Sequence, residues 1–221
     1  MLIKQIFNTS GFLLIESQIK HNAMTSPYQT INSFFDCYGL IHSRSILKHL
    51  IKIADSGKTW SRSSPCDAVY FSEKINELIE AVFTIVNTYD HRKEIILNRD
   101  DNDECWLLRD YNIYCGWHLK NTPWHFFPRH LNKKEFLNPY EALEKFTSFR
   151  NIHQWKETIK DLAYHALSDI PLDEFDDSKS ILRTYIHLNK LIEATHLIEV
   201  RIQPIYQRNA ANGETEKQLE S

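Results

Sequence analysis

The residues of this sequence best suited to chemistry include histidines in two places. The first is an irregular stretch in which Cys115 and His118 are followed by His125 and His130. Zinc accepts such mixed Cys and His sets, but the gap between the two pairs is short against zinc-finger spacings. A single Cys also cannot supply the usual pair of thiolates. We therefore predict no metal site and no cofactor.

The second place is the last apolar segment, where Asn189, Glu193 and His196 follow one another at spacings of four and three residues. On a helix these residues share one side, with His196 next to Tyr185. A histidine near a core needs a hydrogen-bond partner, and Glu193 lies one turn away. Such a pair is most often structural, and an acid–base or ligand-binding role is the alternative. Glu193-x2-His196 is also half of a di-iron motif, but no second Glu-x2-His pair exists, which excludes that site.

The segment from 91 to 137 is long, irregular and rich in aromatic residues. Trp and His have an apolar body and one polar tip, so the segment suits either a cover on a helical core or the roof of a ligand pocket. A site, if the chain has one, is expected where this segment covers the last helix. Its predicted ligand-binding residues are Trp117, His118, Trp124, His125, His130, Asn189, Glu193 and His196.

Helix-start signals lie in front of several apolar segments. Ser26-Pro27-Tyr28-Gln29, Ser64-Pro65-Cys66-Asp67 and Asn138-Pro139-Tyr140-Glu141 each combine a capping residue, a proline at the first helical position and a side chain that reaches back. Apolar spacing then predicts helices that end before Gly39, near Gly57, and over 65–89, 139–150, 151–168 and 178–202. The fold class is all-α: an irregular multi-helix bundle whose connection over about 91–137 has room for a short hairpin.

Length and composition suit one domain. With 221 residues and 42% hydrophobic content, the chain can fill a core. We expect a peripheral N-terminal segment over 1–24, a single helical domain over 25–202 and a flexible polar tail over 203–221. The 4 cysteines include no CxxC pair, and no export signal or membrane span is recognisable, so a cytoplasmic location is expected.

Composition also removes several classes of function. The 5 glycines are scattered, which excludes phosphate loops, dinucleotide-binding fingerprints and the hydrolase nucleophile elbow. A net charge of -3 disfavours binding to duplex nucleic acid.

Two resemblances bear on function. Arg44-x4-His49 resembles the loose signature of HEPN-type helical ribonucleases, which implies roles for that Arg and His in RNA cleavage. The residue after Arg44 is Ser45, whereas Asn, Asp or His is common there in that family. The residues Pro128-Arg129-His130-Leu131, Asn138-Pro139-Tyr140, Trp155 and the run from Leu191 to Ile198 resemble uncharacterised bacterial proteins of similar length. That second resemblance covers about the last two-thirds of the chain and implies a bacterial helical domain without an assigned activity.

We therefore predict a non-enzymatic module that binds another protein or a small ligand, in a regulatory role. The alternative is an enzyme with a dispersed His/Glu site, either metal-dependent or a HEPN-like ribonuclease.

Overall fold

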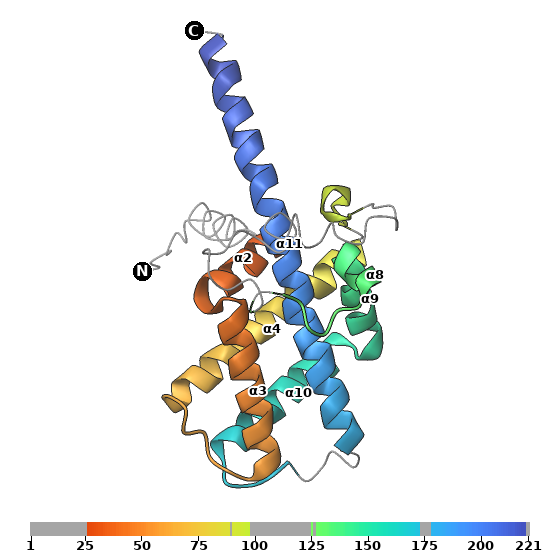
Figure 1. Ribbon diagram of the computed structural model, residues 1–221. Helices are drawn as coiled ribbons and strands as arrows, with labels where there is room; N and C mark the ends of the chain where they lie inside the picture. Colours follow the sequence, from red (N-terminus) through yellow and green to blue (C-terminus); the bar gives the residue numbers. More distant parts are fainter. Residues whose placement is uncertain (1–25, 89, 98–124, 126, 173–177, 220–221) are drawn as a thin grey trace, which may run out of the picture.

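The computed structural model describes residues 26–88, 90–97, 125, 127–172 and 178–219, and over these residues the protein is all-α (Figure 1). The predicted fold class is therefore confirmed. In chain order the elements are α2 (Pro27–Tyr38), α3 (Leu40–Ser56), α4 (Pro65–Thr88), the short 3-10 helix η1 (Lys93–Ile95), α8 (Lys133–Leu137), α9 (Pro139–Phe149), α10 (Ile152–Leu167) and α11 (Ser178–Leu219).

Each of the three proline-led segments starts a helix, and at the first the Gln29 side chain reaches back as the sequence predicts. The backbone N–H of Ser26 donates to Oε1 of Gln29 at 3.1 Å, and the N–H of Tyr140 donates to Oδ1 of Asn138 at 3.2 Å. Helix α4 likewise begins at Pro65. These contacts satisfy groups that a helix end leaves without an internal partner.

Two further capping boxes have no proline and were missed. Asn132 accepts a hydrogen bond from the N–H of Glu135 at 3.0 Å, and Asn151 accepts one from Gln154 at 2.9 Å. The first starts α8, a helix inside the long connection that apolar spacing did not predict because it has only 5 residues. The second starts α10 at its predicted place.

Helix α4 provides the centre of the apolar core. It packs against α2, α9 and α10, and its inward side is the seam expected from spacings of three and four residues. The buried members of that seam are Phe71, Ile75, Leu78, Val82 and Ile85.

Helix α11 crosses the whole bundle between α3 and α9 and also contacts α2 (Figure 1). Every residue from 191 to 202 is buried, in agreement with a central helix. The helix continues to Leu219, whereas apolar spacing ended it at Ile202. The continuation combines strong helix formers such as Ala210 and Ala211 with Pro204 and Gly213, which are weak ones. The predicted N-terminal segment lies outside the described residues.

Candidate functional site

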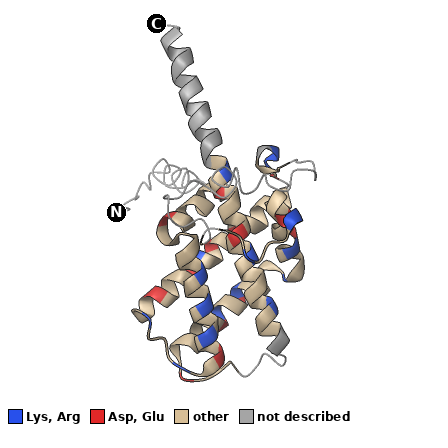
Figure 2. Cartoon of the chain, in the orientation of Figure 1, with Lys and Arg blue, Asp and Glu red and all other residues tan. Residues whose placement is uncertain are grey.

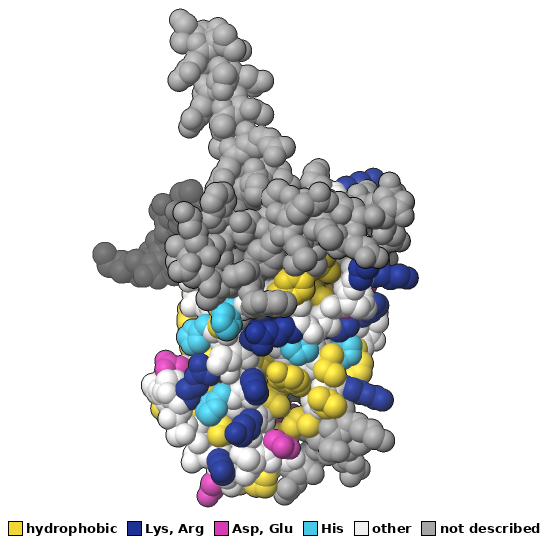
Figure 3. All heavy atoms as spheres, viewed as in Figure 1, with side chains coloured by type: hydrophobic (Ala, Val, Ile, Leu, Met, Phe, Trp, Pro, Cys, Tyr) yellow, Lys and Arg dark blue, Asp and Glu magenta, His cyan; other side chains and the backbone are white. Residues whose placement is uncertain are grey.

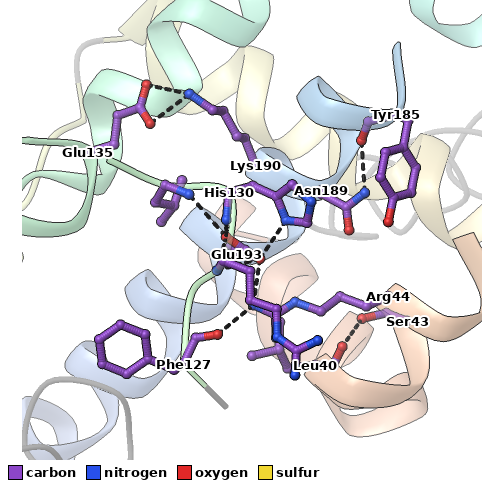
Figure 4. A network of polar contacts seen from close by, with 12 residues as sticks. Leu40, Ser43, Arg44, Phe127, His130, Glu135, Tyr185, Asn189, Lys190 and Glu193 are labelled. Atoms are coloured by element: carbon purple, nitrogen blue, oxygen red, sulfur yellow. Dashed lines mark hydrogen bonds and ion pairs between the residues drawn. The ribbon is translucent and has the colours of Figure 1, made fainter. Parts of the chain in front are cut away.

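Glu193 of α11 lies under a short segment that crosses that helix. We call residues 127–137, which end with α8, the strap. The side chain of Glu193 has 0% of its surface exposed, and it projects from α11 toward the strap and α3 (Figure 4). A fully buried carboxylate is costly unless its oxygens are hydrogen-bonded.

Both carboxylate oxygens of Glu193 are surrounded by donors. Oε1 accepts from Nη2 of Arg44 at 2.5 Å, from the N–H of Arg129 at 3.0 Å and pairs with Nδ1 of His130 at 2.9 Å. Oε2 accepts from the backbone N–H groups of Arg129, His130 and Leu131 at 3.0, 2.8 and 3.2 Å. Consecutive backbone N–H groups of the strap thus wrap one carboxylate, in the manner of an anion-binding nest.

Arg44 joins this contact to a third element. Its guanidinium also donates to the backbone oxygens of His125 and Phe127, both at 3.0 Å. Only 11% of the Arg44 side chain is exposed. One arginine of α3 therefore holds both the strap and the α11 carboxylate that the strap covers.

The electrostatics follow from these contacts. Burial on its own would raise the pKa of Glu193, but the hydrogen bond from His130, the charge of Arg44 and the backbone N–H groups lower that pKa below its ordinary value. Glu193 is thus held as a carboxylate.

The strap also has a buried carboxylate of its own, which is bound by side chains of other helices. Glu135 of α8 accepts from Nζ of Lys190 on α11 at 2.8 and 2.9 Å and from Nζ of Lys145 on α9 at 2.9 Å. Its own capping box adds the N–H of Asn132 at 3.0 Å. Burial would raise the pKa of Glu135, and the bonds from Lys190, Asn132 and Lys145 outweigh it and lower the pKa. The strap thus binds a carboxylate of α11, Glu193, and α11 in turn binds a carboxylate of the strap, Glu135.

Arg201 of α11, which is 6% exposed, holds the far end of the strap. Its guanidinium donates to the backbone oxygen of Ile95 at 3.3 Å and to that of Phe136 at 2.9 Å. The N–H of Leu97 donates to the oxygen of Leu137 at 3.0 Å. The end of the described segment 90–97 and the far end of the strap are therefore fixed side by side on α11.

The structure brings part of the predicted site together. His130 contacts Glu193 as described above, and its ring meets that of Tyr185 edge-on with centroids 5.7 Å apart. The side-chain amide of Asn189 donates to the backbone oxygen of Tyr185 at 2.8 Å. His125 takes part through its backbone oxygen alone in the contact with Arg44. The remaining strap-side candidates, Trp117, His118 and Trp124, lie outside the described residues.

The predicted pairing of His196 with Glu193 is wrong. Nδ1 of His196 lies 3.4 Å from Oε2 of Glu199, and its ring packs on Phe35 with centroids 5.1 Å apart. Spacing along the helix allowed either carboxylate, since both lie three residues from the histidine. Glu193 is not available to His196 because its carboxylate accepts hydrogen bonds from the backbone N–H groups of the strap.

This arrangement is better suited to holding the strap than to proton transfer. A carboxylate whose two oxygens accept several short hydrogen bonds, and whose pKa is lowered, is a weak base. The ribonuclease alternative gives Arg44 a role in RNA cleavage, but the Arg44 guanidinium is bound to Glu193 and to a backbone oxygen of the strap. Nε2 of His49 is buried without a hydrogen-bond partner, and its ring meets Trp60 edge-on at 4.9 Å.

Sequence reasoning missed most of the donors. Asn132-x2-Glu135 is a recognisable capping box, so the start of α8 could have been predicted. No local signal shows that Glu135 also binds lysines of two distant helices, or that Arg44 reaches α11. Within the ranges that the structure describes, no three His, Cys, Asp or Glu side chains are grouped as a metal would need. No described helix is both long and apolar enough to cross a membrane.

Comparisons with known proteins add a limited similarity. No model of a known protein family matches the sequence, and no solved structure matches it. A stretch of 64 residues is 39% identical to a protein of Aquifex aeolicus described as "Uncharacterized protein". The match takes in 28% of this chain and spans 51%, about half, of that relative. The chain is thus similar to a bacterial protein without an assigned activity, in agreement with the resemblance noted from its sequence.

Proposed function

We propose that the chain is a non-enzymatic binding module that takes an acidic segment of another protein on the outer side of α3. The observation that carries the proposal is a row of exposed cations there, Lys48, Lys52 and Arg62, which we call the basic row. None of the three has a carboxylate within ion-pair distance among the described residues. Lysine and arginine residues recur along α3 in Figure 2, and dark blue side chains gather on this part of the surface in Figure 3.

The members of the basic row lie close enough to act together. Lys48 and Lys52 are one helical turn apart, and Nη1 of Arg62 donates to Oγ of Ser45 at 2.9 Å, which holds it beside α3. The positive charges of Arg62 and Lys52 also act on His49. Burial lowers the pKa of His49, and these two nearby charges lower it further. Asp55, near the end of α3, is that helix's one acidic residue.

The strap supports a role in binding because its contacts tie α3, the helix that carries the basic row, to α11. Arg44 leaves α3 on the side of α11, so the contact with Glu193 stiffens the helix that carries the basic row. A rigid, charged helix face suits recognition of a partner, since little order is lost on binding.

An acidic protein segment fits this face better than a nucleic acid does. Proteins that bind single strands combine basic residues with exposed aromatic side chains for base stacking. Among the described residues, Trp60 lies in the segment that carries Arg62, and it is only 7% exposed. The overall charge of -3 also disfavours a polyanion as long as nucleic acid.

Titration with a labelled polyglutamate peptide tests the proposal. We expect salt-sensitive binding that weakens by roughly tenfold or more when Lys48 and Lys52 are both changed to Glu. The control carries Lys93→Glu with Lys160→Glu, two exposed lysines elsewhere, and has the same net charge. The proposal fails if the two double variants bind alike, if the wild-type chain does not bind, or if a single-stranded oligonucleotide binds more tightly than the peptide.

A further inference from the structure

Arg150 lies in the turn between α9 and α10, on a part of the molecule that the proposed function does not use. Its guanidinium carbon is 5.2 Å from the ring centroid of Phe149 and 5.1 Å from that of Trp155. Trp155 is itself fixed, because its Nε1 donates to the backbone oxygen of Phe146 at 3.2 Å. The guanidinium therefore rests on two aromatic side chains, one of them anchored in the core.

The polar contacts of Arg150 leave most of its donors unused. Nη1 donates to Oγ1 of Thr158 at 3.0 Å, and this hydroxyl donates in turn to the backbone oxygen of Gln154 at 2.8 Å. Among the described residues no carboxylate lies within ion-pair distance of Arg150, and its other N–H groups have no hydrogen-bond partner. No nitrogen of Arg150 is both buried and unpartnered, so solvent reaches the unused edge.

A half-buried guanidinium without a counter-ion is unusual. Burial lowers the pKa of Arg150, which means that its charge has lost part of its hydration without gaining a carboxylate in return. The stacking and the single bond to Thr158 compensate only in part, but they hold the planar fork in one orientation. An arginine held in this way is prepared for an anion that approaches its open edge.

Phe149, on which Arg150 rests, also stacks with a histidine that senses the charge of Arg150. His187 of α11 stacks on Phe149 with centroids 4.1 Å apart and rings 13° from parallel. Burial lowers the pKa of His187, and the charges of Lys190 and Arg150 lower it further, against a smaller opposite effect of Glu135. His187 is therefore neutral near pH 7 and senses the local charge.

We propose that Arg150 is the binding residue of a second site, which takes an oxyanionic group, a carboxylate or a phosphate, on its open guanidinium edge. Both groups offer the paired oxygens that match two parallel N–H donors. The site is independent of the basic row, which lies on α3 and shares no residue with it.

The titration of His187 followed by NMR provides the first test. Inorganic phosphate and acetate are added in separate series at constant ionic strength, up to concentrations on the order of tens of millimolar. A bound anion near His187 should raise the pKa of that histidine by about half a unit. The anion with the larger effect at equal concentration identifies the preferred chemistry, and a His187→Gln variant assigns the signal.

Variants distinguish anion binding at Arg150 from a general screening of charges by the added salt. Arg150→Lys keeps the positive charge but loses the parallel N–H donors of the guanidinium. The pKa of His187 should therefore no longer respond to the anion. Arg183→Lys is the control, because Arg183 is exposed and lies one helical turn from His187. The inference is overturned if the wild-type pKa of His187 does not respond to either anion, or if Arg150→Lys responds as the control does. The wild-type series decides the matter even if Arg150→Lys does not fold.

Discussion

The apolar seam of α4 and the two carboxylates in the contact between the strap and α11 are both fully buried, yet they are held by opposite means. The seam consists of side chains such as Leu78 and Ile75 with no exposed surface or almost none, and no charge. The strap contact consists of Glu193, Glu135 and Arg201, each paired with backbone groups or with charges from distant segments.

The difference concerns geometry and tolerance. Apolar packing is non-directional, so a seam adapts when one side chain changes to another of similar size. Hydrogen bonds to a buried carboxylate have fixed directions, and losing one partner leaves the others unsatisfied. The seam holds the bundle together, whereas the carboxylates fix where one particular segment lies.

The largest effect is expected from Glu193→Gln. The change keeps the size of the side chain but presents an amide NH2 group to donors and leaves Arg44 buried without its carboxylate. We expect a loss of about 3–5 kcal/mol in the free energy of unfolding, measured in urea. Glu157→Gln is the control, because 60% of that side chain is exposed, and it should stay within about 0.5 kcal/mol of the wild type. A loss as small for Glu193→Gln would contradict the account.

The next effect is expected in the seam. Leu78→Ala leaves a cavity in the main apolar core, and should cost about 2–5 kcal/mol. Urea unfolding measures this loss as well. A cost below about 0.5 kcal/mol, typical of surface positions, would mean that Leu78 is not a core residue.

The two regions should also differ in their response to acid. The pKa values of Glu193 and Glu135 are lowered in the fold from an ordinary value of 4.5. Their stabilisation is therefore complete above about pH 4.5 and is lost as the pH falls through the lower folded-state values. The fall in unfolding free energy below that pH should be smaller in Glu193→Gln than in the wild type or Leu78→Ala. Parallel pH profiles for all three proteins would refute this assignment.

The smallest expected effect lies at a helix start outside both regions. Asn151→Ala removes the acceptor for the N–H of Gln154 and should cost about 1 kcal/mol, as a midpoint shift in urea unfolding. The effect should be independent of pH from neutral to mildly acidic conditions, unlike that of Glu193→Gln. A cost as large as that of Leu78→Ala would show that Asn151 does more than cap α10.

The same contrast explains what the sequence could predict. The seam and the proline-led starts depend on residues a few positions apart, so periodicity and capping chemistry located α2, α4 and α9 closely. The meeting of His130 with Glu193 followed from a general expectation that a long aromatic connection covers the central helix. The wrong partner for His196 and the missed role of Arg44 share one cause: the choice among donors is made by segments more than 60 residues away in sequence.

Hydrogen exchange of the strap amides tests the central claim most directly, since the claim is that the Glu193 carboxylate fixes the strap on α11. The backbone N–H groups of Arg129, His130 and Leu131 should exchange slowly in the wild-type protein, although they lie in no regular helix. In Glu193→Gln they should exchange much faster, while the amides of α4 stay protected. Fast exchange of the three amides in the wild-type protein, or equal protection in the variant, would contradict the account.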